Sequence, residues 1–475
     1  MAKNWNSASL PGLPSKQVAA GHGKYLPVAG GRSLHSSFCQ SRITMTSIAS
    51  SAGANPMPMA PPAAPHNAQL KRELRQAQFR KRAAALALIA PLAIFLLLTF
   101  LVPIAMLLKR AVENPEIATT LPHTVAALSN WDRKSSPPDA AYAGLATDLL
   151  QAREDSSAGS LARRLNSEIS GARSIIMKTA RALPLLDADG KPLPPAQIKQ
   201  ALIDIDEQWQ QLPYWQVIAK NGAPYSPYYL LAALDLKQDV FGHIEKADPD
   251  ASVYQKIFGR TFWMGLVATL ACLVLGYPLA YWLSTMSERR ANLFMILVLI
   301  PFWTSILVRV AAWIVLLQSE GLVNKALMAT GLTQAPLELL FNRIGVYIAM
   351  THILLPFMIL PLYSVMKAIP PTYLRAAVSL GSHPFAAFWR VYVPQTYPGI
   401  GAGALLVFIL SVGYYITPAL LGGPNEQMVS YYIAYFTNVT INWGMACALG
   451  ALLFAATLVL YGVYRRFTKN DVAMG

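Results

Sequence analysis

The sequence contains few charged residues and few cysteines. Only 13% of its 475 residues are charged, whereas 54% are hydrophobic, and the mean hydropathy is positive, at +0.37. This balance disfavours a soluble enzyme and favours a protein with several membrane spans. Cys39, Cys272 and Cys447 are far apart in the sequence, so the chain offers no disulfide framework and no metal-binding spacing.

Sequence patterns for nucleotide binding and catalysis are missing as well. The P-loop pattern G-x-x-x-x-G-K-[ST] does not occur, because the pairs Gly23-Lys24 and Gly190-Lys191 continue into Tyr and Pro. The 7 histidines form no ligand set, and the sequence contains no recognisable combination of nucleophile, base and orienting group. We therefore expect a non-catalytic chain that binds no metal or other cofactor.

Six long apolar runs are present instead. Each exceeds the roughly 20 residues that cross a bilayer, and they occupy residues 83–108, 261–284, 291–316, 344–366, 399–420 and 443–464. Basic residues lie in alternate connections, at 80–82, 289–290, 367–390 and 465–469, whereas 421–442 has none. Because Lys and Arg are enriched in cytoplasmic loops, the sequence predicts an all-α, multi-pass membrane protein with both termini in the cytoplasm.

The formal charge of +15 is divided unevenly along the chain. Residues 111–255 carry 13 Lys and Arg against 18 Asp and Glu, whereas the rest carries 26 against 6. Turn clusters and the helical spacing of apolar residues predict that 111–255 is a mostly helical, water-soluble domain inserted after the first span, outside the cytoplasm. The remaining basic residues flank the spans, where they meet anionic lipid, so we do not expect nucleic-acid binding.

Residues 1–82 are rich in Ser, Ala, Pro and Gly and contain no acidic residue before Glu73. This composition lacks the apolar area that offsets the entropy of ordering, so we expect a disordered cytoplasmic tail. The composition also resembles an organelle transit peptide, but no sustained amphipathic helix is present, which favours a plain tail or a start site placed too far upstream. Residues 467–475 are expected to form a second cytoplasmic tail.

The loop 367–398 combines a small-residue helix, a glycine and an aromatic helix. Gly381 would end the first helix with a positive φ, Pro384 would begin the second, and Pro394 would end it. One face of the first helix consists of Tyr373, Ala376, Ala377 and Leu380, and the second helix carries Phe385, Phe388, Trp389 and Tyr392 at helical spacing. From spacing alone, these side chains either fold back on the spans or dock on a partner.

The spacing in this loop resembles the EAA loop of ABC-importer permeases. That loop reads Glu-Ala-Ala, three residues, Gly, nine residues, Ile, one residue, Leu-Pro. The matching positions are Arg375, Ala376, Ala377, Gly381, Val391, Val393 and Pro394. The resemblance implies that 372–394 forms coupling helices that dock in a groove of an ATPase subunit. Because Arg375 replaces the family's Glu, a salt bridge made by that Glu is not implied.

Other stretches of 260–466, such as 301–317, 356–369 and 412–430, resemble permeases of spermidine/putrescine importers. The resemblance implies a type I permease fold in a bacterial inner membrane. It also implies two ATPase subunits that bind ATP and Mg, a second permease subunit and a periplasmic solute-binding protein. The domain 111–255 is an insertion that the resemblance does not cover.

Charged residues are scarce within the predicted spans. Arg309 is inside one of them, and no Asp or Glu lies in any of the six. An arginine there either has a function or reaches the outer surface with its long side chain. Polyamine permeases often carry a Glu near the stretch that aligns with 412–418. The candidate residues of the substrate pathway are Trp303, Thr304, Arg309, Tyr414 and Tyr415, whose rings could attract a cation or merely pack.

These features predict the permease subunit of an ATP-driven importer whose solute is a polyamine or a related small organic amine. Two alternatives stay open at this point. One is a membrane sensor with an extracytoplasmic helical ligand domain, and the other is an ATP-independent carrier or channel. A co-purifying ATPase distinguishes the importer from the carrier.

Overall fold

The computed structural model describes residues 66–187, 189–249 and 252–472. The chain divides into two compact units, 1–82 and 83–475. Of the predicted disordered tail, residues 1–65 lie outside the described part, whereas 66–82 are helical and belong to α1 (His66–Leu96). The prediction of disorder does not hold for 66–82, because this stretch is rich in Ala, Gln, Leu, Lys and Arg, which favour helix.

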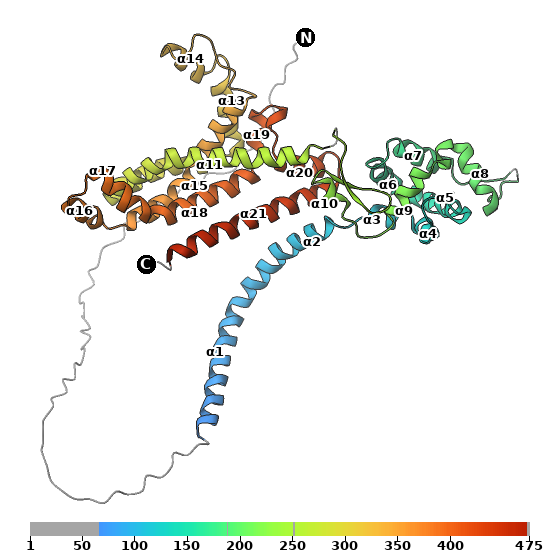
Figure 1. Cartoon of the computed structure of the whole chain (residues 1–475), viewed down its shortest axis with the longest axis horizontal. Helices are drawn as coiled ribbons and strands as arrows, with labels where there is room; N and C mark the ends of the chain where they lie inside the picture. The colour runs from blue at the N-terminus through green and yellow to red at the C-terminus, as the bar shows by residue number, and fades with distance from the viewer. Residues whose placement is uncertain (1–65, 188, 250–251, 473–475) are drawn as a thin grey trace, which may run out of the picture. The chain divides into compact units, whose positions relative to one another are not determined.

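In the described part of the chain, 6 helices are long and apolar enough to cross a membrane, in agreement with the prediction. They are Arg75–Arg110, Tyr254–Thr285, Ile306–Ala329, Arg343–Ala368, Pro384–Gly413 and Trp443–Arg466. Figure 1 labels their main elements as α1 and α2 (Val102–Arg110), α11 (Tyr254–Thr285), α13 (Ile306–Leu317) with α14 (Leu322–Ala329), α15 (Arg343–Ala368), α18 (Val393–Gly413) and α21 (Trp443–Val472).

Two of these helices contain a π-helical turn that ends two positions before a proline. The turn η1 (Leu97–Leu101) precedes Pro103, and η4 (Phe388–Tyr392) precedes Pro394. Proline lacks an N–H, and in an α-helix its ring crowds the carbonyl four residues earlier. A π turn is wider and gives the ring room, so both helices continue. The prediction that Pro394 ends the second loop helix is therefore wrong, because α18 runs on to Gly413.

Helices α11, α15 and α18 pack around a shared apolar core. Met264, Leu354 and Val407, one from each helix, are fully buried in it. Glycine lets two of these backbones approach closely, since a Cβ on Gly403 of α18 would lie only 3.2 Å from the backbone oxygen of Met358 in α15. Small residues at such contacts stabilise helix pairs in membranes through van der Waals packing.

Two predicted spans are interrupted in the structure. The third consists of α12 (Glu288–Leu299), a 3-10 turn η3 (Ile300–Trp303) and α13. Pro301 cannot donate a backbone hydrogen bond, which favours the break at this point. The fifth stops at Gly413, before α19 (Ile416–Leu421), η5 (Pro424–Glu426) and α20 (Val429–Asn438). The short helix predicted in the 317–342 loop is present as α14.

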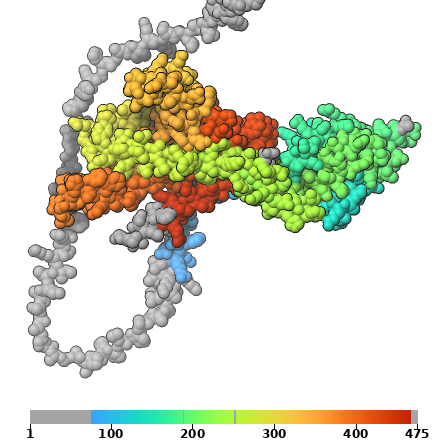
Figure 2. Space-filling view, turned by 45° about the horizontal axis from the view of Figure 1, so that its top comes forward, coloured from blue at the N-terminus to red at the C-terminus, as the bar shows by residue number. Residues whose placement is uncertain are grey.

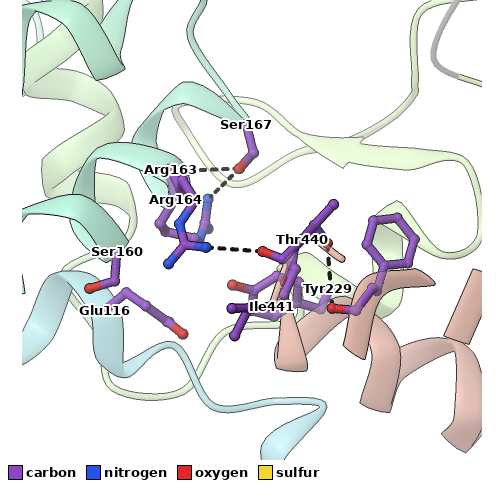
Figure 3. A pocket seen from close by; sticks show the side chains of 10 residues that line it. Glu116, Ser160, Arg163, Arg164, Ser167, Tyr229, Thr440 and Ile441 are labelled. Atoms are coloured by element: carbon purple, nitrogen blue, oxygen red, sulfur yellow. Dashed lines mark hydrogen bonds between the residues drawn. The ribbon is translucent and has the colours of Figure 1, made fainter. Parts of the chain in front are cut away.

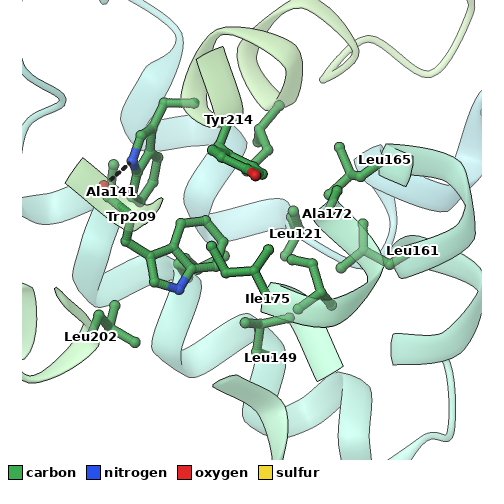
Figure 4. Packing of buried hydrophobic residues seen from close by; sticks show 14 of the residues in the cluster. Leu121, Ala141, Leu149, Leu161, Leu165, Ala172, Ile175, Leu202, Trp209 and Tyr214 are labelled. Carbon is green, nitrogen blue, oxygen red and sulfur yellow. Dashed lines mark hydrogen bonds between the residues drawn. The ribbon is translucent and has the colours of Figure 1, made fainter. Parts of the chain in front are cut away.

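Residues 115–220 form a helical lobe with a core of its own, called the insertion lobe below. Its elements are α3 (Pro115–Ala118), α4 (Pro122–Leu128), α5 (Asp139–Glu154), α6 (Ala158–Asn166), α7 (Ala172–Ala182), α8 (Pro195–Ile205), η2 (Glu207–Gln210) and α9 (Leu212–Lys220). Figure 4 shows Trp209 in this core beside Leu202, and its ring centroid lies 5.5 Å from that of Trp215. Both tryptophans are fully buried, so the lobe has an apolar core separate from that of the spans.

Residues after the lobe attach the insertion to the spans. Asp235 follows α10 (Tyr228–Ala232) and accepts hydrogen bonds from the backbone N–H groups of Tyr254 and Gln255, at 2.9 and 2.7 Å. It thereby caps the start of α11. Tyr229 packs against Gly444 near the start of α21, where a Cβ would overlap the tyrosine ring. A small antiparallel sheet, β1 (Leu236–Gln238) with β2 (Ile244–Lys246), completes this region.

The insertion lobe makes a further contact through α6. Figure 3 shows the Arg163 guanidinium pointing at the backbone oxygen of Thr440, to which it donates a 3.0 Å hydrogen bond. Arg164 is buried beside it, and its guanidinium carbon lies 3.7 Å from the centroid of the Tyr228 ring. A pocket of about 260 Å³ lies between these groups, with Glu116 on its wall. The lobe thus contacts the connection between α20 and α21.

Candidate functional site

The loop that resembles the EAA loop contains two short helices joined at a glycine. The first, α16 (Thr372–Ser379), is terminated at Gly381, whose φ is +92°, as the sequence predicts. The N–H of Gly381 donates to the carbonyl of Val378 at 3.0 Å, and the N–H of Ser382 donates to that of Ala377 at 3.1 Å. These two bonds close the helix end, and glycine adopts the left-handed backbone that they require without strain.

The second helix begins with α17 (Pro384–Ala387). Nδ1 of His383 accepts a 3.3 Å hydrogen bond from the backbone N–H of Phe385 and caps this helix. Pro384 occupies the first turn, where its missing N–H has no intrahelical partner to lose. In the space-filling view of Figure 2, the orange segment with α16 and α17 lies at one end of the span bundle. We call residues 372–394, from α16 through α17 and η4 to the first turn of α18, the coupling segment.

One side of the coupling segment packs against α11. The rings of Phe388 and Tyr392 stack on each other with centroids 5.5 Å apart, and both meet the ring of Tyr281 at 5.3 Å. Tyr392 is buried, and Phe388 packs against the bundle core. For these two residues, the interpretation that the aromatic side chains fold back on the spans is correct.

The other side of the coupling segment is exposed. Leu380 is 89% exposed, Phe385 68% and Trp389 54%. A single exposed apolar residue is ordinary on a protein surface. These three lie within ten positions, and a cluster of exposed apolar side chains is typical of a contact surface. We call Leu380, Phe385 and Trp389 the exposed tip.

The remaining motif positions are divided between α16 and the part of the coupling segment that enters the bundle. Arg375 and Ala376 are exposed, and Ala377 is half-buried, all on α16. The end of the motif lies where the helix enters the bundle, with Val391 half-buried, Val393 buried and Pro394 half-buried. The motif therefore connects an accessible helix to a packed one.

The candidate pathway residues lie at the two interruptions of the spans. Trp303 is the last residue of η3, and Thr304 follows it before α13 begins. Tyr414 and Tyr415 separate α18 from α19. The carbonyl of Tyr414 accepts a 3.0 Å hydrogen bond from Ser430 Oγ, which satisfies part of the open helix end. Broken helices with free backbone groups recur at the solute sites of transporters.

Arg309 lies on α13, within range of two other helices. Trp313, one turn further along, donates its indole N–H to Nδ1 of His352 in α15 at 3.2 Å. The Arg309 guanidinium lies within electrostatic range of His352 and of Tyr414, which is another candidate residue. Its Nε is buried and lacks a hydrogen-bond partner among the described residues. The residue as a whole is half-buried, so a functional role and a side chain that extends to the surface both stay open.

Sequence reasoning missed Tyr281, Ser430 and His352. Tyr281 contacts residues more than a hundred positions away, so no local spacing identifies it. His352 sits alone in an apolar run, and a single histidine in such a run is more often a packed core residue than a ligand. The aromatic stretch 277–282, "YPLAYW", is the signal that could have drawn attention to Tyr281.

Residues 253–470 match the family described as the binding-protein-dependent transport system inner membrane component. The chain is 36% identical over 224 residues to the spermidine/putrescine transport system permease protein PotB of Haemophilus influenzae, covering 46% of this chain and 78% of that protein. It is 34% identical over 218 residues to PotB of Escherichia coli, covering 46% of this chain and 79% of that protein. The crystal structure of a bacterial ABC transporter involved in the import of the acidic polysaccharide alginate aligns with a TM-score of 0.40 at 16% identity, over 46% of this chain and 80% of that chain.

The matched region begins directly before α11 and contains the coupling segment, whereas α1, α2 and the insertion lobe precede it. The sequence resemblance, the all-α membrane fold and the family match therefore agree. This chain belongs to the type I permeases of ABC importers, the inner-membrane components of binding-protein-dependent transport systems.

Proposed function

We propose that this chain is the transmembrane subunit of an ATP-driven importer for a small organic amine of the polyamine class. The names of the related permeases support this solute class. In this proposal the protein lies in a bacterial inner membrane with both termini in the cytoplasm. A periplasmic binding protein delivers the solute, a second permease completes the pathway, and two ATPase subunits bind ATP and Mg and carry out the hydrolysis.

The observation that carries the proposal is the two-sided coupling segment. Its exposed tip offers apolar surface to a partner, while Phe388 and Tyr392 fix its other side to Tyr281. A rigid contact on one side and an accessible one on the other are what a mechanical link between two subunits requires. Arg375, Ala376, Ala377 and Gly381 lie on the accessible part, and Val391, Val393 and Pro394 on the part that joins the bundle.

Helix α11 would carry the movement of the coupling segment along the bundle. It has 32 residues, which correspond to about 48 Å at 1.5 Å per residue. Tyr281 contacts the coupling segment near one end, and Asp235 caps the other end. Closure of the ATPase subunits would tilt α11 and its neighbours, so that a central cavity opens outward to the binding protein and then inward after hydrolysis. The ATP-bound state must favour one arrangement of the bundle over the other.

The solute pathway is assigned to the helix breaks. Trp303, Thr304, Tyr414 and Tyr415 would supply aromatic faces and hydroxyl groups, and cation–π attraction suits an organic ammonium group. Arg309 lies within electrostatic range of Tyr414 and would help to set the position of the solute along the pathway. Because the six predicted spans contain no Asp or Glu, the binding protein would provide most of the charge recognition.

A transport assay with one surface variant tests the proposal. Purified complex in vesicles should take up spermidine or putrescine only with ATP and binding protein present. F385D should abolish uptake by disrupting the exposed tip, whereas F79D, a like change at an exposed residue of α1, should leave it intact. Uptake that persists without any co-purifying ATPase would contradict the importer and favour the carrier.

A further inference from the structure

The coupling segment and its flanks carry charge of a single sign. Within residues 367–398, the charged residues are Lys367, Arg375 and Arg390, and this stretch has no Asp or Glu. Lys367 donates a 3.0 Å hydrogen bond to the backbone oxygen of Met286. Arg375 and Arg390 are exposed, and neither forms an ion pair with any residue that the structure describes. The apolar tip is therefore accompanied by two guanidinium groups without anionic partners.

Arg375 is the better placed of the two to meet a partner. It lies on α16, one turn before Val378, and the same helix is followed by the highly exposed Leu380. Arg390 lies in η4, where the helix enters the bundle. Arg375 is off the face of α16 that leads to Leu380, but it is exposed on the same two-turn helix. A partner whose groove encloses α16 together with the tip would therefore also remove water from around Arg375. A desolvated guanidinium is costly unless an anionic group pairs with it.

We propose that the ATPase surface that receives the coupling segment is an apolar groove with an acidic edge, and that Arg375 forms an ion pair with a carboxylate on that edge. This inference rests on the proposed function. Complementary charges across an interface contribute more to the specificity of binding than to its affinity. The permease would accordingly reject an ATPase whose groove presents Lys or Arg at the same place.

An anionic lipid surface is the competing occupant, because basic and aromatic residues also favour the membrane interface. The shape of the segment argues for the protein partner. A helix that lies on a membrane presents a continuous apolar face, whereas Leu380 and Phe385 lie on either side of the turn at Gly381. The helix α16 has only 8 residues, too few for a stable interfacial helix of its own.

A zero-length crosslink detects the carboxylate directly. Carbodiimide joins an amine to a carboxylate that it contacts but does not join a guanidinium. The R375K variant of the purified complex should therefore yield a new covalent product with the ATPase subunit, and peptide mass spectrometry should place the bond on an Asp or Glu. Because Lys367 and the other lysines of the permease are present in every sample, R375Q, which adds no amine, is the matched control.

Charge reversal supplies an independent measurement. R375E should reduce the ATPase retained on the purified permease about tenfold or more, because like charges at an interface repel. R375K should retain it, and R390E should have the smaller effect. Changing the crosslinked carboxylate of the ATPase to Lys should restore binding to R375E.

The outcomes separate this inference from the function on which it rests. If no ATPase accompanies even the wild-type permease, the proposed function fails. If the ATPase binds but R375E retains it at the wild-type level, or R375K forms no product beyond the R375Q control, the acidic edge is refuted. A defect of R375E that appears only in anionic vesicles, with ATPase retention unchanged, would assign Arg375 to lipid and equally overturn the proposal.

Discussion

The ring of Tyr281, near the C-terminal end of α11, meets the ring of Tyr392 at an interplanar angle of 76°, with the centroids 5.3 Å apart. Phe388 meets Tyr281 at the same distance. Tyr281 of α11 thus contacts both Phe388 and Tyr392, the two aromatic residues after α17 that face the bundle. This contact connects the exposed tip to a helix of the bundle core.

Replacing Tyr281 should weaken coupling rather than assembly. Y281A removes two aromatic contacts worth about 0.5–1.5 kcal/mol each, so the coupling segment would move without moving α11. We expect uptake to fall several-fold while ATP hydrolysis by the complex persists. Y281F keeps the ring and should behave as wild type. A parallel loss of hydrolysis and uptake would instead indicate failed assembly.

Substitution of Gly381 should impair the protein because of the backbone conformation at this position and not because of steric crowding. Its φ is +92°, and a Cβ there would meet nothing within 4 Å. G381V should therefore cost about 1–2 kcal/mol through left-handed strain alone and uncouple hydrolysis from uptake. G381N should be milder, since Asn tolerates this conformation. G259V on α11, where a Cβ is equally free and φ is ordinary, is the control, and equal effects at both glycines would refute the argument.

Gly444 should be essential for attachment of the insertion. A side chain there would overlap the ring of Tyr229, which is buried at the base of α10. G444V should displace α10 and make its residues, Tyr228–Ala232, accessible to limited proteolysis. G450A is the matched control on α21, because its Cβ would meet Leu107 at an ordinary 3.6 Å. Unchanged protease resistance of G444V would show that α10 is not anchored by this contact.

Trp303 should contribute to recognition of a cationic solute. Its ring is 79% exposed at the break before α13. W303A should raise the apparent KM for the amine about 2- to 30-fold, which corresponds to a cation–π contribution of about 0.5–2 kcal/mol. W303F should retain part of the effect, and W443A at a half-exposed tryptophan of α21 should have none. The measurement is initial uptake at varied solute concentration.

The insertion lobe should be removable without damage to the spans. The backbone N–H of Asn114 donates to the oxygen of Pro224 at 2.8 Å, so the two ends of the excised segment are adjacent. Replacing 115–223 with a short Gly/Ser linker preserves α10 and its contacts with α21. We expect normal membrane insertion and ATPase binding, because the lobe core is separate from the span core. Aggregation of the shortened chain would disprove this independence.

Local chemistry explains why much of the architecture could be predicted. The apolar runs identify the membrane spans because each needs only enough consecutive hydrophobic residues to cross a bilayer. Gly381 was recognisable because a helix end with positive φ selects glycine. The break at Pro301 was missed because hydropathy is insensitive to backbone geometry. Pro394 was misjudged because a preceding π turn can accommodate a proline, and neither hydropathy nor helical spacing reveals that turn.

The sequence by itself determined the number of spans, the helical insertion, the coupling segment and its uniform positive charge, since each depends on residues within a few positions of one another. Only the tertiary structure decided that Phe388 and Tyr392 face Tyr281 while Leu380, Phe385 and Trp389 remain exposed. It also decided that Asp235 caps α11 and that Trp313 of α13 donates a hydrogen bond to His352 of α15. The reason is physical: helical periodicity defines which side chains share a face, but the packing of the whole bundle determines which face is buried.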